Sequence, residues 1–402
     1  MNYHPNKEIL DKYADVLVNF ALNSGKGIRK GDVILLQIPE CAKPFLLALR
    51  KAILQAGGHT IVNYIPDEIA AEFYELANEE HLNFFPAKYY RGLVDQIDHS
   101  IFIEADTNPH ELKHTHPSKI MKKGKALKPY MDWRNEKENA GKFTWTLALY
   151  GTEAIAKEAG LTIEEYWNEI IKACYLDEEN PVQKWKEVVA EIERVKDKLN
   201  LLKIEELNVK TVSGDTDLVI GLGQGRQWMG GSGRNIPSFE VFISPDWRKT
   251  EGKIKFTEPL YRYGNLIKGV RLEFKEGRVV RSSAEQGEHV LKEMIAVENA
   301  DKVGEFSLTD SRLSRITKFM ATTLFDENVG KEFGNTHIAL GNSYKDSYLG
   351  DPSKLTKEEW DNLGYNDSSV HTDIVSTENR EVHATLPDGR QILIYKDGKF
   401  VI

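Results

Sequence analysis

Residues 31–66 read GDVILLQIPECAKPFLLALRKAILQAGGHTIVNYIP and place a strand, a helix and a second strand in direct succession. The apolar run at 33–39 is typical of a strand that is buried on both faces. From 41 to 56 the apolar side chains recur at helical spacing until two glycines end the pattern, and 59–65 is again strand-like. The segment therefore predicts two parallel strands joined by a right-handed helical crossover.

The same alternation continues through the first part of the chain. Helical spacing or strand-like runs mark the segments 6–24, 67–78, 98–106 and 144–151. Strands that alternate with helices predict a doubly wound parallel sheet. A charged segment with helical spacing follows at 153–200. We therefore assign residues 1–185 to an α/β domain that ends in a helical connector.

The second part of the chain is rich in short strands. From about residue 206 apolar runs alternate with turn signals, and the Asp-Gly pairs at 388–389 and 397–398 are strong hairpin turns. Longer helices are expected at 284–299 and at 309–324. These features predict an α+β, β-rich domain over residues 186–402.

Composition narrows the class of function. The chain has 402 residues, of which 41% are hydrophobic and 29% charged, and its formal net charge is −9. This charge argues against a general binder of nucleic acid or of anionic membranes. A polar N-terminus and the lack of an apolar run of about 18 to 20 residues predict a cytoplasmic protein without a membrane segment. Cys41 and Cys174 offer neither a disulfide framework nor a thiolate metal site.

A cluster of potential metal ligands lies between residues 326 and 373. Glycine and proline repeatedly interrupt any regular period there, so the segment is expected to form mainly loops. It contains His337, Tyr344, His371 and Asp373, and the last two would point to one face of an extended backbone. Imidazole, carboxylate and phenolate groups suit a divalent ion such as Zn, Co or Mn.

The motif HELKH at 110–114 competes with this cluster. It matches HExxH, in which His110 and His114 would bind a single zinc ion and Glu111 would act as general base. Pro109 and Pro117 leave little room for the helix that such a site requires. We therefore interpret the motif as a polar connection that leaves the parallel sheet.

Two other features could be mistaken for functional sites or could belong to one. GLGQGRQW, residues 221–228, departs from a dinucleotide-binding fingerprint because Arg226 stands where the third glycine belongs and further glycines disrupt the expected helix. The acidic pair Asp326 and Glu327 is compatible either with chemistry or with the end of a helix.

Four short motifs together resemble the M29 family of aminopeptidases, of the aminopeptidase T and aminopeptidase S type. In chain order they are NIPSFEVFISP (235–245), VGEF (303–306), THIALGNSY (336–344) and SSVHTD (368–373). Carried over onto these motifs, the family's metal ligands are Glu240, Glu305, His337, Tyr344, His371 and Asp373. The Asp-Glu-Asn of the family is present as Asp326, Glu327 and Asn328.

The resemblance covers essentially the whole chain and implies a homodimeric enzyme with a catalytic C-terminal domain. It implies that two divalent ions (Zn, Co or Mn, with Mg also possible) serve to remove single residues from peptides with a free N-terminus. Two ions can activate a water and polarise the scissile carbonyl. Glu305, Tyr344 and Glu327 are then the expected catalytic residues. The sequence leaves open which carboxylate bridges the ions and whether Glu305 or Glu327 moves the proton.

The alternatives are a single-zinc peptidase built on the HELKH motif and a protein without enzymatic activity. In the second case the sheet domain would bind a small ligand, and the histidine-rich segment would be structural.

Overall fold

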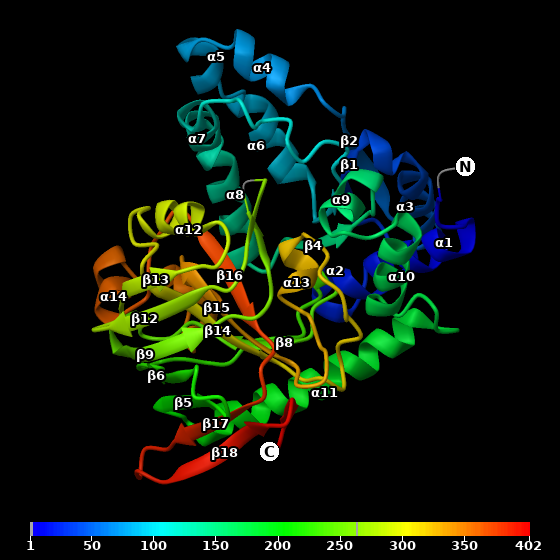
Figure 1. The fold of residues 1–402 in the computed structure, drawn as a ribbon. Coiled ribbons are helices and arrows are strands. Elements are labelled where there is room, and N and C mark those ends of the chain that lie inside the picture. Colours follow the sequence, from blue (N-terminus) through cyan, green and yellow to red (C-terminus); the bar gives the residue numbers. More distant parts are fainter. Residues whose placement is uncertain (1–2, 263) are drawn as a thin grey trace. The chain divides into compact units, whose positions relative to one another are not determined.

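The computed structural model describes residues 3–262 and 264–402, and the chain divides into two compact units (Figure 1). The first unit comprises Met1–Lys186 and Ser232–Ile236, and the second comprises Glu187–Gly231 and Pro237–Ile402. The chain therefore passes between the units three times. Among the described residues, no helix combines the length and the apolar character that crossing a membrane requires.

The first unit contains a parallel sheet with the strand order β2-β1-β3-β4-β7. The strands are β1 (Val33–Pro39), β2 (His59–Ile65), β3 (His99–Glu104), β4 (Thr144–Leu149) and β7 (Asn235–Ile236). The order reverses direction at β1, which is the arrangement of a doubly wound sheet. The prediction of an α/β fold with such a sheet is confirmed.

Helices cover both faces of this sheet (Figure 1). On one face, α3 (Lys43–Gln55) contacts β1 and β2. On the other, Leu93 of α6 (Ala87–Gln96) packs against a buried cluster that includes Leu35 of β1. The remaining helices of the unit are α1 (Lys7–Val16), α2 (Leu22–Gly25), α4 (Ala70–Leu76), α5 (Glu79–Asn83), α7 (Pro117–Ala126), α8 (Lys128–Asn139), α9 (Glu153–Glu158) and α10 (Ile163–Ala173). The long helix α11 (Pro181–Leu202) begins here and continues into the second unit.

The second unit is built mainly on an antiparallel sheet of order β13-β12-β9-β6-β5-β17-β18-β19. Its strands are β5 (Glu206–Thr211), β6 (Asp217–Gly221), β9 (Thr250–Lys255), β12 (Arg271–Lys275), β13 (Arg278–Ser283), β17 (Arg380–Thr385), β18 (Gln391–Lys396) and β19 (Lys399–Phe400). The two Asp-Gly pairs lie between β17, β18 and β19, as the hairpin signals predicted.

A smaller antiparallel sheet of order β16-β15-β14-β8 lies in the same unit. Its strands are β8 (Glu240–Ile243), β14 (Val303–Thr309), β15 (Asn335–Gly341) and β16 (His371–Ser376). One face consists largely of buried aliphatic and aromatic side chains, among them Val241, Phe306, Ile338 and Ile374. Because side chains alternate along a strand, the intervening residues share the opposite face. A short hairpin, β10 (Leu260–Arg262) and β11 (Asn265–Ile267), completes the strands of the unit.

The expectation of loops across 326–373 is wrong for its central part. The glycines there flank regular elements and do not interrupt them: β15 is buried along its whole length, and β16 and the helix α14 (Lys357–Leu363) follow. Gly341, at the end of β15, has a φ of +107°, and a Cβ there would meet the carbonyl oxygen of Val370 at 2.2 Å. Only glycine fits that strand end.

The predicted helix at 309–324 is absent. Side chains bind the backbone there in place of helical hydrogen bonds: the Asp310 carboxylate accepts a bond from the Arg312 amide, and Asp326 accepts bonds from the amides of Met320 and Thr322. Ala321 also has a positive φ of 53°. Only the short helix α13 (Thr323–Asp326) forms at its end, and the other predicted helix shortens to α12 (Glu288–Ile295).

Candidate metal centre

Side chains that can bind metal share one face of the small sheet. The strand pairing places Glu240 opposite Thr309, Ser307 opposite His337, and Ala339 between Glu305 and Asp373. Directly paired residues of antiparallel strands point to the same side. This face therefore carries Glu240, Glu305, His337, His371 and Asp373, brought together from four strands.

Glu240, Glu305 and His337 form a compact triad. Nε2 of His337 lies 3.1 Å from Oε1 of Glu305 and 3.3 Å from Oε2 of Glu240. One ligand atom from each residue fits within 4.8 Å of the other two, a spacing compatible with a shared metal ion. The His337 side chain is buried, and that of Glu240 is only 12% exposed.

His371 and Asp373 form a second group on the other side of Glu305. Nε2 of His371 lies 3.4 Å from Oδ1 of Asp373 and 3.6 Å from Oε2 of Glu305. Glu305 thus turns one carboxylate oxygen toward each histidine. Ala339 is in register between Glu305 and Asp373, so its small side chain leaves space at the centre of the face.

Backbone carbonyls orient both imidazole rings. Nδ1 of His337 donates a hydrogen bond to the carbonyl oxygen of Glu327 at 3.1 Å, and Nδ1 of His371 donates one to that of Asn342 at 2.8 Å. These bonds make Nδ1 the donor to the backbone, so Nε2 is the nitrogen that faces the carboxylates. This is the usual outer-shell support of a metal-binding histidine.

Tyr344 lies at the rim of this face. Its ring is 4.7 Å from the ring of His371, and its backbone amide donates a hydrogen bond to Oγ of Ser244. Burial of the phenol, and then the charge of Glu305, raise its pKa well above 10. In this structure the phenol is therefore protonated, and the contact of its ring with His371 keeps it beside the ligand-bearing face.

Asp326 and Glu327, the acidic pair at the end of α13, have different roles. Asp326 is a structural residue, because its two oxygens accept bonds from backbone amides. Glu327 is buried beside the two groups of ligands and is held by Asn328, whose amide nitrogen lies 3.3 Å from its Oε1. Oδ1 of Asn328 also accepts a bond from the amide of Phe239, next to Glu240. Asn328 belongs to the Asp-Glu-Asn motif found in the sequence. Its contacts with Glu327 and with the Phe239 amide, however, can be seen only in the folded protein.

The charges of the cluster require cations. Burial, and then the charge of Glu240, raise the pKa of Glu327 well above its usual value. Burial also raises the pKa of Glu305 to about 7, although its hydrogen bond from His337 acts in the opposite direction. With Glu240 and Asp373, four carboxylates gather around two imidazoles, and Arg262 adds one positive charge near Asp373. Buried carboxylates without matching positive charge are costly, and divalent cations would supply that charge, so the donor set fits metal.

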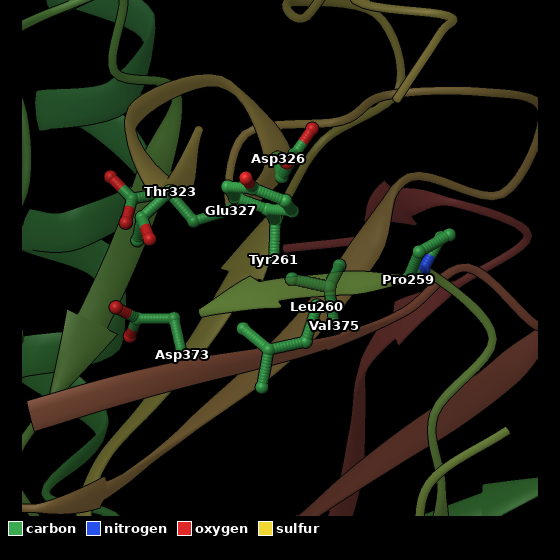
Figure 2. A pocket seen from close by; sticks show the side chains of 8 residues that line it. All are labelled: Pro259, Leu260, Tyr261, Thr323, Asp326, Glu327, Asp373 and Val375. Carbon is green, nitrogen blue, oxygen red and sulfur yellow. The ribbon is translucent and has the colours of Figure 1, made fainter. Parts of the chain in front are cut away.

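A cavity opens beside these carboxylates (Figure 2). It encloses about 270 Å³ of empty space, counting its opening to solvent. The lining residues are Pro259, Leu260, Tyr261, Thr323, Asp326, Glu327, Asp373 and Val375. A small group, such as a water molecule, that occupies the enclosed part of this cavity therefore lies against Glu327 and Asp373.

The competing motif forms no comparable centre. Residues 110–114 form turns and no helix, and His110 pairs with Glu158 on the surface at 3.0 Å. The Glu111 carboxylate accepts a hydrogen bond from the amide of Ala71. The interpretation of HELKH as a connection agrees with these contacts, which use Glu111 to hold the start of α4.

Arg226 of the glycine-rich segment is structural. Its guanidinium donates to the carbonyl oxygens of Ser244, Gln224 and Leu363 and stacks 3.7 Å from the ring centroid of Tyr365. Residues 227–239, which follow it directly, contain no helix, as the further glycines predicted.

We expect the metal-free protein to lose stability as the pH rises from about 5 to about 9. Glu305 has a pKa of about 7 in the folded protein, which is above the pKa of a glutamate in the unfolded chain. Its contribution to stability is therefore complete below the unfolded pKa and is lost as the pH rises through 7. Burial lowers the pKa of His371, but the charges of Asp373 and Glu305 and the hydrogen bonds to Asp373 and the Asn342 backbone together outweigh burial. They leave the pKa at about 9, so this contribution is also lost as the pH rises. Each shift amounts to about 3 kcal/mol.

Thermal unfolding of chelated and metal-loaded protein across this pH range measures the effect. Because metal competes with protons for the same atoms, the increase in Tm on adding metal should widen toward pH 9. Parallel Tm curves for the two forms would contradict the assignment.

Comparisons with known proteins agree with this site. The family described as thermophilic metalloprotease (M29) matches residues 6–400. The chain is 29% identical to aminopeptidase PepS of Streptococcus thermophilus, over 99% of each chain. It is also 29% identical to aminopeptidase T of Thermus thermophilus, over 98% of this chain and 99% of that protein. The solved structure of wild-type AmpT from Thermus thermophilus superposes with a TM-score of 0.83 at 25% identity, covering 98% of this chain and all of that one.

Proposed function

The chain belongs to the thermophilic metalloprotease family M29 and is a metal-dependent aminopeptidase, and we propose that it works with two divalent ions on the ligand-bearing face of the small sheet. The proposed ligands are Glu240, Glu305, His337, Tyr344, His371 and Asp373. Zn, Co or Mn suits this mixture of imidazole and oxygen donors, and Mg is also possible.

The position of Glu305 carries the proposal. Its Oε1 lies 3.1 Å from His337 and its Oε2 lies 3.6 Å from His371, so one carboxylate joins both groups of ligands. Glu305 would therefore be the carboxylate that both groups share, with Glu240 and His337 on one side of it and His371 and Asp373 on the other. Each histidine would then offer Nε2 to an ion, because Nδ1 donates to a backbone carbonyl.

The ions, when bound, supply a water of lowered pKa and polarise the scissile carbonyl. Glu327 is the best candidate to move the proton, because its carboxylate lines the cavity beside Asp373. Its raised pKa suits a group that takes a proton from a water and returns it to the leaving amine. Asn328 holds this carboxylate in place at Oε1.

The acidic surroundings also explain the choice of a chain end. A free α-amino group is positively charged or offers a lone pair, and both properties suit a cavity lined by Glu327 and Asp373. An internal peptide bond presents neither. We propose that the substrates are peptides with a free N-terminus and that the enzyme acts in the cytoplasm as a homodimer, as the family resemblance implies.

Metal content and aminoacyl hydrolysis, measured on one preparation, test the proposal. We expect two ions per chain, release of a fluorophore from aminoacyl substrates, and loss of both on chelation. One ion per chain would contradict the bridging role of Glu305. Bound metal without hydrolysis of any aminoacyl substrate would contradict the peptidase.

A further inference from the structure

The carbonyl oxygen that orients His337 has a second donor. The Glu327 carbonyl accepts a hydrogen bond from Nδ1 of His337 at 3.1 Å, and it also accepts one from Nδ2 of Asn335 at 3.0 Å. The same nitrogen of Asn335 donates to the carbonyl oxygen of Val329 at 2.7 Å. Asn335 precedes His337 by two residues on β15, so strand alternation directs both side chains to one face. Asn335 therefore fixes the carbonyl on which the His337 imidazole depends.

The carbonyl oxygen that orients His371 is held in a different way. It belongs to Asn342, and the two residues that flank Asn342 both bond to Asn366. Nδ2 of Asn366 donates to the Gly341 carbonyl at 2.5 Å, the Ser343 amide donates to the Asn366 carbonyl at 2.9 Å, and the Asn366 amide donates to Oγ of Ser343 at 3.0 Å. Because both neighbours are tied, the Asn342 peptide group has little freedom to rotate. Its oxygen therefore stays directed toward Nδ1 of His371, at 2.8 Å.

Both asparagines are buried and bond to the backbone. Asn335 is fully buried, and Asn366 is 4% exposed. Nδ2 of Asn366 donates to a second carbonyl, that of Asn299, at 2.7 Å, so each of the two side-chain amides donates to two backbone carbonyls. Alanine at either position would leave these buried carbonyls without their donors. The carbonyl would then be free to turn, and the imidazole bound to it would lose its fixed direction.

The two asparagines act on different halves of the ligand set. We call Glu240 and His337 the His337 group, and we call His371 and Asp373 the His371 group; each pair is in contact. The carbonyl that supports His337 follows α13, whereas the carbonyl that supports His371 follows β15. A change at one asparagine should therefore disturb one histidine and leave the other supported.

We propose that Asn335 and Asn366 are positioning residues that set the affinities of the two metal ions separately, Asn335 at the His337 group and Asn366 at the His371 group. The inference rests on the proposed two-ion function and adds the residues that adjust each ion. Loss of such an outer-shell partner typically lowers metal affinity by about 10- to 100-fold. Each change from asparagine to alanine should therefore weaken one ion by that factor and leave the other nearly unchanged.

A crossed set of variants assigns each asparagine to its ion. In the His371→Asn background the His337 group keeps its imidazole, so Co²⁺ binding reports mainly on that group. Adding Asn335→Ala there should lower the affinity for Co²⁺ about 10- to 100-fold, whereas adding Asn366→Ala should change it little. The His337→Asn background should give the reverse. Calorimetric titration of the chelated full-length protein with Co²⁺ measures these affinities.

Asn200→Ala is the matched control. Asn200 lies on α11, and its side-chain amide also bonds to the backbone, at the amide and the carbonyl of Trp228. This change should lower Tm without altering the affinity for either ion. Excess Co²⁺ should restore most of the hydrolysis to Asn335→Ala and Asn366→Ala, because all proposed ligands remain. If an alanine variant does not fold, Asn335→Leu or Asn366→Leu removes the same donor while filling the space.

The outcomes separate the inference from the function on which it rests. Wild-type affinity for both ions in the Asn335 and Asn366 variants, or equal weakening of both ions by each variant, would overturn the inference while the two-ion enzyme stands. A loss of affinity of the same size in Asn200→Ala would also overturn it, because general stability would then set the affinity. A wild-type chain that binds fewer than two ions would overturn the two-ion proposal itself.

Discussion

His337→Asn and His371→Asn are each expected to abolish peptide hydrolysis while the protein remains folded. Each change removes the Nε2 atom that faces Glu305 but retains an amide near the position of Nδ1, which bonds to a backbone carbonyl in the native protein. Removing a single oxyanion hydrogen-bond donor already costs roughly 10²–10³ in kcat. Loss of a metal ligand should cost more, because it affects both activation of the water and polarisation of the carbonyl.

The measurement combines kcat/KM, metal content and Tm. Matched controls are His110→Ala and His114→Ala, which alter the competing motif and should retain both metal and activity. Near-normal hydrolysis by either asparagine variant at saturating metal would refute the assignment. Loss of all metal from the two controls would transfer the site to HELKH.

Acetylation of the substrate's N-terminus should lower kcat/KM by two to three orders of magnitude. An acetyl group removes the positive charge and the lone pair of the amine, which the acidic cavity at Glu327 and Asp373 is proposed to bind. The lost interaction corresponds to about 3 to 4 kcal/mol in the transition state. An additional residue at the C-terminus should matter far less, because the proposed recognition does not involve that end.

A peptide and its acetylated form, compared by rate and by product analysis, give the test. Stepwise release from the free N-terminus is expected, with the acetylated peptide intact over the same time. Equal rates for the two peptides, or cleavage at internal bonds, would show that the centre does not select chain ends.

Local patterns predicted the first unit well because each of its strands is an apolar run bounded by turns. β1 and β2 occur where 33–39 and 59–65 indicate them. The helical pattern at 309–324 gave a wrong prediction because tertiary contacts replace the helical hydrogen bonds there. Its backbone groups bond to Asp310 and Asp326, and helical spacing alone does not reveal that competition.

The site illustrates the same limit. His371 and Asp373 could be assigned to one face from their spacing, because both lie on one strand. Glu305 could not, since its relation to His337 arises from the pairing of β14 with β15, which are separated by the irregular segment and α13. The alternation of Thr336, His337, Ile338 and Ala339 was a usable strand signal, but Gly334 and Gly341 at its two ends indicated a loop. The family resemblance supplied the ligand set that local reasoning lacked.

The division of the small sheet into an apolar face and a ligand-bearing face also has a consequence for how the protein matures. A slip of one residue in the pairing of β14 or β15 would turn carboxylates or imidazole into the core and aliphatic side chains toward the metals. Such a misregistered chain would lack the joint contacts of Glu305 with His337 and His371, and so would not form the proposed metal site. Metal binding would therefore distinguish correctly registered chains from misregistered ones.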